Sequence, residues 1–213
     1  SFIEYNFVHG MSMLNNFIVN ELSGIYIDIT KDSLYCDAIN DPRRNSSQSA
    51  MAIMTKSLLL LIAPILTYTA DEIIEFAPSI IKGDKEDIFD FVYEEIRIED
   101  FDFNAAYMNS AREKFYEIVD TLKKEKIIKS TLELVLVTES AIISKMDKTS
   151  AEDWFIVSHI SHSEVVDELG KFEVDGDMFV IQKATKAKCP RCWKYQSHDE
   201  ESTCERCSKV VNA

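Results

Sequence analysis

Four cysteines near the end of this chain restrict what it can fold into more than any other feature. They form two pairs, Cys189 with Cys192 and Cys204 with Cys207, and eleven residues separate the pairs. Two residues between cysteines let both sulfurs converge on one ion, and two such pairs complete a closed tetrahedral shell that suits zinc. The tail is too short to build its own core, so we expect one structural Zn²⁺ per chain.

The sequence leaves two other states of these cysteines open, namely reduced free thiols and two disulfides. The opening residues SFIEYNF lack the basic start and apolar run of a secretory signal. A cytoplasmic, reducing compartment is therefore expected, and there a metal is favoured over disulfides. His198 could replace one ligand, but four well-spaced cysteines make that unnecessary.

Composition favours helices over many short strands. Only 5 glycines and 4 prolines occur in 213 residues, and 46% of the residues are hydrophobic, as in an ordinary folded protein. The longest uncharged stretch, 57–70, contains Pro64 and is shorter than the roughly 20 apolar residues of a membrane-spanning helix. No membrane partner is expected.

Apolar residues at helical spacing dominate the first part of the chain. A helix over 4–36 is expected in two pieces, with Asn20 as the N-cap between them, and a long helix from about 43 to 63 follows. Thr69 and Glu72 have the spacing of a capping box at the start of a further helix. Short connections between these helices predict an antiparallel bundle.

The apolar period changes from 3.6 to 2 after a helix expected over 105–126. Alternation predicts strands around Leu132–Leu136, at Phe155 and Val157, and on both sides of the hairpin turn at Asp175-Gly176. The predicted fold class is therefore mainly α with a small α+β unit and a zinc-knuckle tail.

Three regions are expected along the chain. They are a helical domain over 1–103, a small α+β connecting domain over 104–182 and a zinc-binding module over 183–213.

Charge is spread unevenly over these regions. The formal net charge is −14, which by itself argues against a nucleic-acid binder. Residues 79–182 hold 12 basic and 24 acidic side chains, whereas residues 183–213 hold 7 and 4. A polyanion could therefore still be bound at the two ends of the chain. Binding to DNA is not expected.

Basic and aromatic side chains at the two ends are candidate nucleic-acid contacts. Arg43 and Arg44 begin the long helix, where guanidinium groups suit phosphate or base contacts, or else neutralise nearby aspartates. Trp193 and Lys194 follow the first cysteine pair and suit base stacking and phosphate contact. Alternatively, Trp193 covers the metal knuckle. No constellation typical of a catalytic site is present.

Four segments resemble bacterial isoleucyl-tRNA synthetases, which are class I aminoacyl-tRNA synthetases. Residues 26–35, YIDITKDSLY, resemble their Y-L-D-I-x-K-D-R-L-Y stretch, with Ser33 in place of the family's Arg. The other three segments resemble an R-R-x-S-x-Q-x-A helix start (43–50), an L-x-A-P-I-L-x-F-T-A-E-E segment (61–72) and a K-C-x-R-C-W zinc module (188–193).

The resemblance implies that the chain is a C-terminal part of such an enzyme. The parent would activate isoleucine with ATP and transfer it to tRNA(Ile), while this part, an expected monomer, would recognise the anticodon region. The HIGH and KMSKS signatures of the ATP site do not occur in the sequence, so it would bind and position rather than catalyse. The implied tRNA contacts are Arg43, Arg44, Arg191, Trp193, Lys194 and Arg206.

Two other interpretations remain open from the sequence. One is a zinc-ribbon protein-interaction module on a helical bundle, with no role in RNA binding. The other is the C-terminal part of another class I synthetase, specific for valine, leucine or methionine. Salt-dependent binding of a tRNA anticodon stem-loop would separate the first of these from a synthetase.

Overall fold

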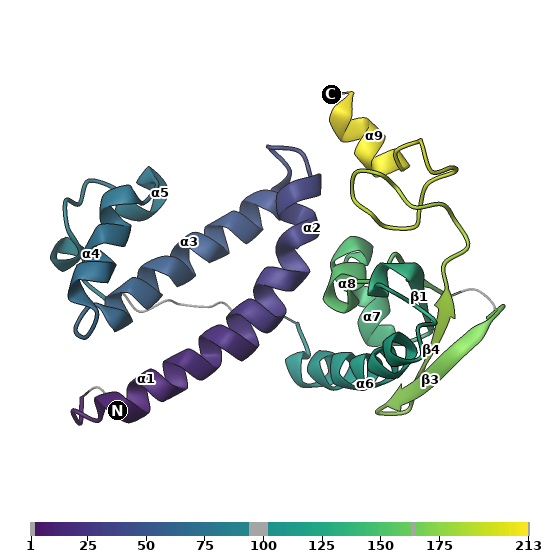
Figure 1. The fold of residues 1–213 in the computed structure, drawn as a ribbon, viewed down its shortest axis with the longest axis horizontal. Coiled ribbons are helices and arrows are strands. Elements are labelled where there is room, and N and C mark those ends of the chain that lie inside the picture. The colour runs from purple at the N-terminus through teal and green to yellow at the C-terminus, as the bar shows by residue number, and fades with distance from the viewer. Residues whose placement is uncertain (1–2, 94–101, 163–164, 213) are drawn as a thin grey trace. The chain divides into compact units, whose positions relative to one another are not determined.

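The computed structural model of the protein describes residues 3–93, 102–162 and 165–212 (Figure 1). Its internal contacts divide the chain into two compact units. Unit 1 comprises residues 1–37 together with 103–213, and unit 2 comprises residues 38–102. The described residues are mainly helical with a small four-stranded sheet, which confirms the predicted fold class in outline.

Unit 1 begins with one continuous helical segment. The α-helix α1 (Phe7–Asn16) continues as the π-helix η1 (Phe17–Ile27) and then as the α-helix α2 (Asp28–Cys36). The prediction of an N-cap at Asn20 is wrong, because Asn20 lies inside this run. Its side-chain amide donates a hydrogen bond to Asn16 Oδ1 at 2.6 Å instead.

Unit 2 consists of helices packed around a small apolar core. The long helix α3 begins where predicted, since Asp41 accepts a hydrogen bond from the Arg43 amide at 2.9 Å. The described helices are α3 (Pro42–Ile62), α4 (Thr67–Phe76), α5 (Ser79–Lys82) and the 3₁₀ helix η2 (Ile88–Asp90). The core consists of Leu59, Ala63, Ala70, Ile74 and Ile88.

The predicted capping box at Thr69 is wrong. Helix α4 begins two residues earlier, at Thr67, so the backbone at Thr69 is already helical. The chain re-enters helix directly after α3, and the Thr67 hydroxyl donates to the Ala63 carbonyl at 2.8 Å. Residues 88–90 form η2, whereas residues 94–101 lie outside the described part of the chain.

The rest of unit 1 contains the sheet and further helices. The helices are α6 (Ala105–Lys124), α7 (Ala141–Lys145), α8 (Lys148–Phe155) and α9 (Glu205–Val211). The strands are β1 (Leu134–Thr138), β2 (His159–Ser161), β3 (Glu168–Val174) and β4 (Asp177–Lys183). Their order is β2-β1-β4-β3, and β1 pairs parallel with β2 and antiparallel with β4.

The main core of unit 1 lies between α6, α8 and the sheet (Figure 1). Phe115, Phe155 and Phe179 are fully buried there, and the Phe172 ring stacks on Phe179 at 4.8 Å between centroids. The predicted hairpin is confirmed. Asp175 and Gly176 both have positive φ, +50° and +89°, as a two-residue hairpin turn requires.

The predicted strand at Phe155 and Val157 is wrong. Phe155 ends helix α8, and Ile156 adopts the left-handed conformation that stops the helix, with φ +56°. Both predicted residues are buried, but they belong to a helix end and the following turn, and the strand starts at His159. Across the described ranges, no helix is both long and apolar enough to cross a membrane.

Candidate functional site

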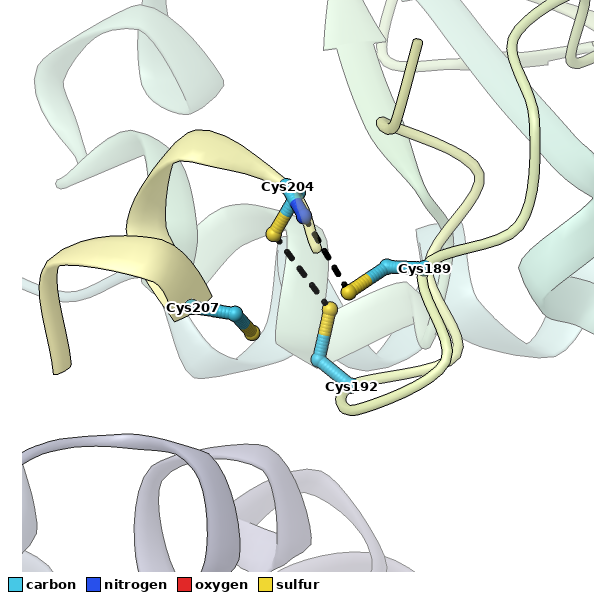
Figure 2. Close-up of side chains that lie close together, drawn as sticks. All are labelled: Cys189, Cys192, Cys204 and Cys207. Carbon is cyan, nitrogen blue, oxygen red and sulfur yellow. Dashed lines mark hydrogen bonds between the residues drawn. The ribbon is translucent and has the colours of Figure 1, made fainter. Parts of the chain in front are cut away.

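The four tail cysteines converge on one point (Figure 2). Cys189 and Cys192 lie on the loop after β4, Cys204 caps helix α9, and Cys207 lies in its first turn. All four side chains are buried, and their sulfur atoms lie within 4.8 Å of one another. The Cys192 and Cys204 sulfurs are 3.7 Å apart.

This geometry fits a tetrahedral metal site. Metal–sulfur bonds of about 2.3 Å place the sulfurs of a tetrahedral shell roughly 3.8 Å apart, close to the separation of Cys192 and Cys204. The cysteines carry free thiols, so the alternative of two disulfides is not what this structure contains. His198 is exposed and does not belong to the cluster. The four cysteines could therefore hold one metal ion.

Backbone amides around the cluster favour the thiolate form of Cys189, which is the form that binds a cation. Burial raises the pKa of Cys189, but the amides of Cys192, Cys204 and Arg191 outweigh it and bring the pKa down to about 6. The Cys204 amide lies 3.3 Å from the Cys189 sulfur. Burial raises the pKa of Cys192 and of Cys204, and repulsion from neighbouring thiolates raises both pKa values further. A divalent cation removes that repulsion.

A fifth cysteine lies beside the cluster. Cys36, at the end of α2, is 7% exposed and packs with the four tail cysteines. Burial, followed by the Asp32 carboxylate, raises the pKa of its thiol to about 11, so it stays neutral at physiological pH. Arg191 connects Cys36 with the tail cysteines, since its guanidinium donates to the Cys36 carbonyl at 2.5 Å and lies 3.5 Å from the Cys207 sulfur.

Lys194 does not lie at the surface. Its side chain is 3% exposed, and the ammonium lies 2.8 Å from an Asp153 oxygen and 3.4 Å from a Glu152 oxygen, both on α8. Burial lowers the pKa of Lys194, but Asp153, Asp32 and Glu152 outweigh that effect, and the pKa stands above its usual value. Lys194 is therefore a charged, paired lysine.

Arg206 forms a fork with the end of helix α2. Its Nη2 lies 2.7 Å from Asp32 Oδ1 while Nη1 contacts the other oxygen of that carboxylate, and Nη1 also lies 3.3 Å from Asp37 Oδ1. Burial works against the charge of Arg206, but these carboxylates outweigh it and hold the pKa above its usual range.

Trp193 has an unusual backbone and an exposed ring. Its φ is +65°, in the left-handed region that favours glycine, and its amide donates to the Cys189 carbonyl at 3.0 Å. The side chain is 60% exposed, and the Lys188 ammonium lies 5.5 Å from the ring centroid. A cavity of about 380 Å³, with Tyr35 and Ile156 also in its wall, adjoins the indole.

The structure brings four of the six predicted RNA contacts together, namely Arg191, Trp193, Lys194 and Arg206. Arg43 and Arg44 lie in unit 2, half-buried in the first turn of α3. Sequence reasoning missed the carboxylates that face the tail cations. These are Asp32, Asp37, Glu152 and Asp153.

Comparisons with known proteins agree with these features. A model of the family "Anticodon-binding domain of tRNA ligase" matches residues 1–139. The isoleucine–tRNA ligase of Sulfurimonas denitrificans is 75% identical over the whole chain, and that of Nitratiruptor sp. is 58% identical over 99% of it. The Campylobacter jejuni enzyme is 49% identical over 99% of the chain.

The chain spans 23% of the length of each of these relatives. The family match covers more than half of the chain, from the first helix to strand β1, and it agrees with the mainly helical fold described above. The chain therefore belongs to the anticodon-binding domain family of tRNA ligases.

Proposed function

We propose that this chain is the tRNA-binding C-terminal region of an isoleucine–tRNA ligase. The observation that carries the proposal is the family match, together with identity to isoleucine–tRNA ligases along the whole chain. The complete protein would activate isoleucine with ATP and transfer it to tRNA(Ile) in the cytoplasm. This region, monomeric and with its N-terminal helices in an antiparallel bundle, would recognise the anticodon part of the tRNA.

We also propose that the four-cysteine cluster binds one structural Zn²⁺. Four thiolates form a closed, soft donor set that suits zinc and leaves no open position for a substrate. In the described tail, the buried apolar residues are the four cysteines themselves: Cys189, Cys192, Cys204 and Cys207. Without an ion the tail has no other core, so metal binding supplies most of its folding free energy.

The RNA contacts would come from both units, with Arg43 and Arg44 on α3 and Trp193 on the knuckle. An exposed indole next to an apolar cavity suits stacking of an unpaired base, which is worth ~1–3 kcal/mol. The left-handed backbone of Trp193 supports a functional role, because a non-glycine residue there is strained. Arg43 and Arg44 would meet phosphates.

The test of tRNA binding uses the full-length protein, with Trp193→Ala and Arg43→Ala/Arg44→Ala measured separately. We expect each variant to bind tRNA(Ile) more weakly while isoleucine-dependent pyrophosphate exchange stays unchanged. The arginine variant should also lose part of the salt dependence, because phosphate contacts release counterions. Unchanged tRNA affinity in both variants would mean that the recognition surface lies elsewhere.

The zinc proposal predicts one zinc per chain in the purified protein by elemental analysis. Two matched variants distinguish the cysteines that bind the metal from a neighbouring cysteine that does not. Cys204→Ser should lose the metal, whereas Cys36→Ser should keep it, because Cys36 lies beside the ligand set without belonging to it. Four freely titratable tail thiols and a zinc ratio near zero in the native protein would contradict the proposal.

A further inference from the structure

We propose that Lys194 and Arg206 are positioning residues that hold the four-cysteine module on helices α2 and α8, rather than RNA contacts. The part of the inference that concerns the RNA-facing Trp193 rests on the proposed function. The ion pairs of unit 1, from which the positioning role is argued, do not depend on that function.

Each cysteine pair carries one of these cations. Lys194 follows Cys192 by two residues, and Arg206 lies between Cys204 and Cys207. Both side chains pair with carboxylates on other elements of unit 1. Lys194 pairs with α8 through Asp153 and Glu152, and Arg206 pairs with Asp32 on α2 and with Asp37 just after it.

The carboxylates of these pairs are buried or nearly so, and the Lys194 side chain is 3% exposed, whereas that of Arg206 is 27% exposed. The Asp153, Glu152 and Asp37 side chains are 8%, 5% and 5% exposed, and that of Asp32 is 14% exposed. A buried carboxylate without its cation is strongly destabilising. An RNA phosphate could therefore recruit Lys194 or Arg206 only by breaking ion pairs to these carboxylates.

Asp32 links the two cations. It accepts the Arg206 fork and lies 3.9 Å from the Lys194 ammonium, while α2 itself packs against α8. Further hydrogen bonds join the same surfaces. The Tyr195 amide donates to the Ser158 hydroxyl at 2.5 Å, and the Gln196 side chain donates to the Ser158 carbonyl. The module is thus attached to two helices and to the turn before β2.

Trp193 depends on this attachment. It lies between Cys192, which belongs to the four-cysteine cluster, and Lys194, which pairs with Asp153 on α8. Its backbone is therefore held on both sides, which places the residue that carries the exposed indole. Metal binding and ion pairing act on the same short segments, so each should strengthen the other by the same factor.

Asp32 is the sharpest place to test this coupling, because it lies 174 residues from Arg206 in sequence and is not among the cysteine ligands. The experiment compares Asp32→Asn, Arg206→Gln, the double variant and Arg206→Lys in the zinc-loaded full-length protein. Lys209→Gln is the matched control, since Lys209 lies on the same helix but is exposed and pairs with Glu205. Three quantities are measured: zinc transfer to a colorimetric chelator, amide exchange of residues 203–210, and tRNA(Ile) affinity against salt.

We expect Asp32→Asn and Arg206→Gln each to speed zinc loss on the order of tenfold, as substitutions around metal ligands do, and to raise amide exchange in 203–210. The double variant should lose zinc more slowly than the two single effects multiplied together would give, because both substitutions remove the shared Arg206–Asp32 pair. Arg206→Lys should recover little, since lysine cannot form the fork. The affinity of Asp32→Asn and Arg206→Gln for tRNA should fall without a change in salt slope. Lys209→Gln should change neither zinc loss nor amide exchange.

The proposal is overturned if Asp32→Asn leaves zinc loss and amide exchange as in the parent protein. It is also overturned if Arg206→Gln lowers the salt slope by about 1 with zinc retention unchanged, and Arg206→Lys restores affinity, because that is the behaviour of a phosphate contact. Faster zinc loss in a protein that shows no tRNA binding would support the positioning role and contradict only the proposed function.

Discussion

At the scale of single residues, buried polar side chains in unit 1 are paired across long sequence distances. Tyr107 on α6 is an example. It is 2% exposed, and its hydroxyl lies 2.5 Å from Asp177 Oδ2 and 2.7 Å from the Ser140 hydroxyl. Burial, followed by the hydrogen bond to Asp177, raises the pKa of Tyr107 to about 12. The neutral phenol is therefore the form that the fold stabilises.

This pairing predicts a pH dependence of stability. Tyr107→Phe should lower the free energy of unfolding by about 1–2 kcal/mol at neutral pH, because it removes a hydrogen bond to a carboxylate. The folded pKa is raised above the unfolded value of about 10, so the advantage of tyrosine is complete below pH 10 and is lost as the pH rises to 12.

Urea unfolding at pH 8 to 12, followed by Trp154 fluorescence, measures this difference. The Trp154 indole donates to the Met108 carbonyl at 3.0 Å, so it reports on the same core. Tyr35→Phe is the control, because Tyr35 is 77% exposed. If the difference in unfolding free energy between the parent protein and Tyr107→Phe is the same at pH 9 and pH 12, the predicted titration is wrong.

At the scale of elements, helix α6 packs closely on strand β3 at a glycine. A Cβ atom built on Gly170 would lie 2.8 Å from Cγ2 of Ile118. Real carbon atoms do not approach so closely, so the Ile118 side chain or the two elements would have to shift. The position also lies next to an irregularity in the pairing of β3 with β4.

Gly170→Ala should therefore lower stability by about 1–3 kcal/mol, the usual cost of overpacking. A pair of second-site changes identifies the contact. Ile118→Ala removes Cγ2 and should cancel part of the loss, whereas Ile118→Val keeps Cγ2 and should not. Thermal unfolding of the single and double variants gives these values, and equal rescue by both changes at Ile118 would rule out the contact as the cause.

At the scale of the whole molecule, the described residues of unit 1 form two separate buried clusters. One contains the aromatic and aliphatic core around α6, α8 and the sheet, and the other consists of cysteines alone. The first cluster needs no ion, while the second has no carbon core of its own. The two should therefore respond differently when metal is removed.

Treatment with a strong zinc chelator under reducing conditions should unfold the tail and leave the main core intact. In hydrogen exchange followed by mass spectrometry, residues 187–212 should lose their protection, while residues 105–124 of α6 should keep theirs. Readdition of zinc should restore the tail, because binding and folding are one equilibrium. Retained protection in 187–212 after complete zinc removal would show that the tail has a core that does not depend on metal.

Much of this protein followed from local sequence. Helices α3 and α6 were predictable because the helical spacing of their apolar residues is a local pattern. The hairpin at Asp175-Gly176 was predictable for the same reason, since the turn itself requires positive φ. The errors at Asn20, Thr69 and Phe155 arose where the same local signals suit a helix interior or a helix end equally well.

The sequence by itself determined the four-cysteine cluster, because the spacing within each pair sets which sulfurs can meet. Only the tertiary structure decided the roles of the residues between those cysteines. Trp193 and Lys194 are neighbours, yet the indole is exposed and the ammonium is buried against α8. The physical reason is that the partners of a buried charge lie on distant segments, here 174 residues away for Arg206 and Asp32, and no local pattern specifies which carboxylate will arrive there.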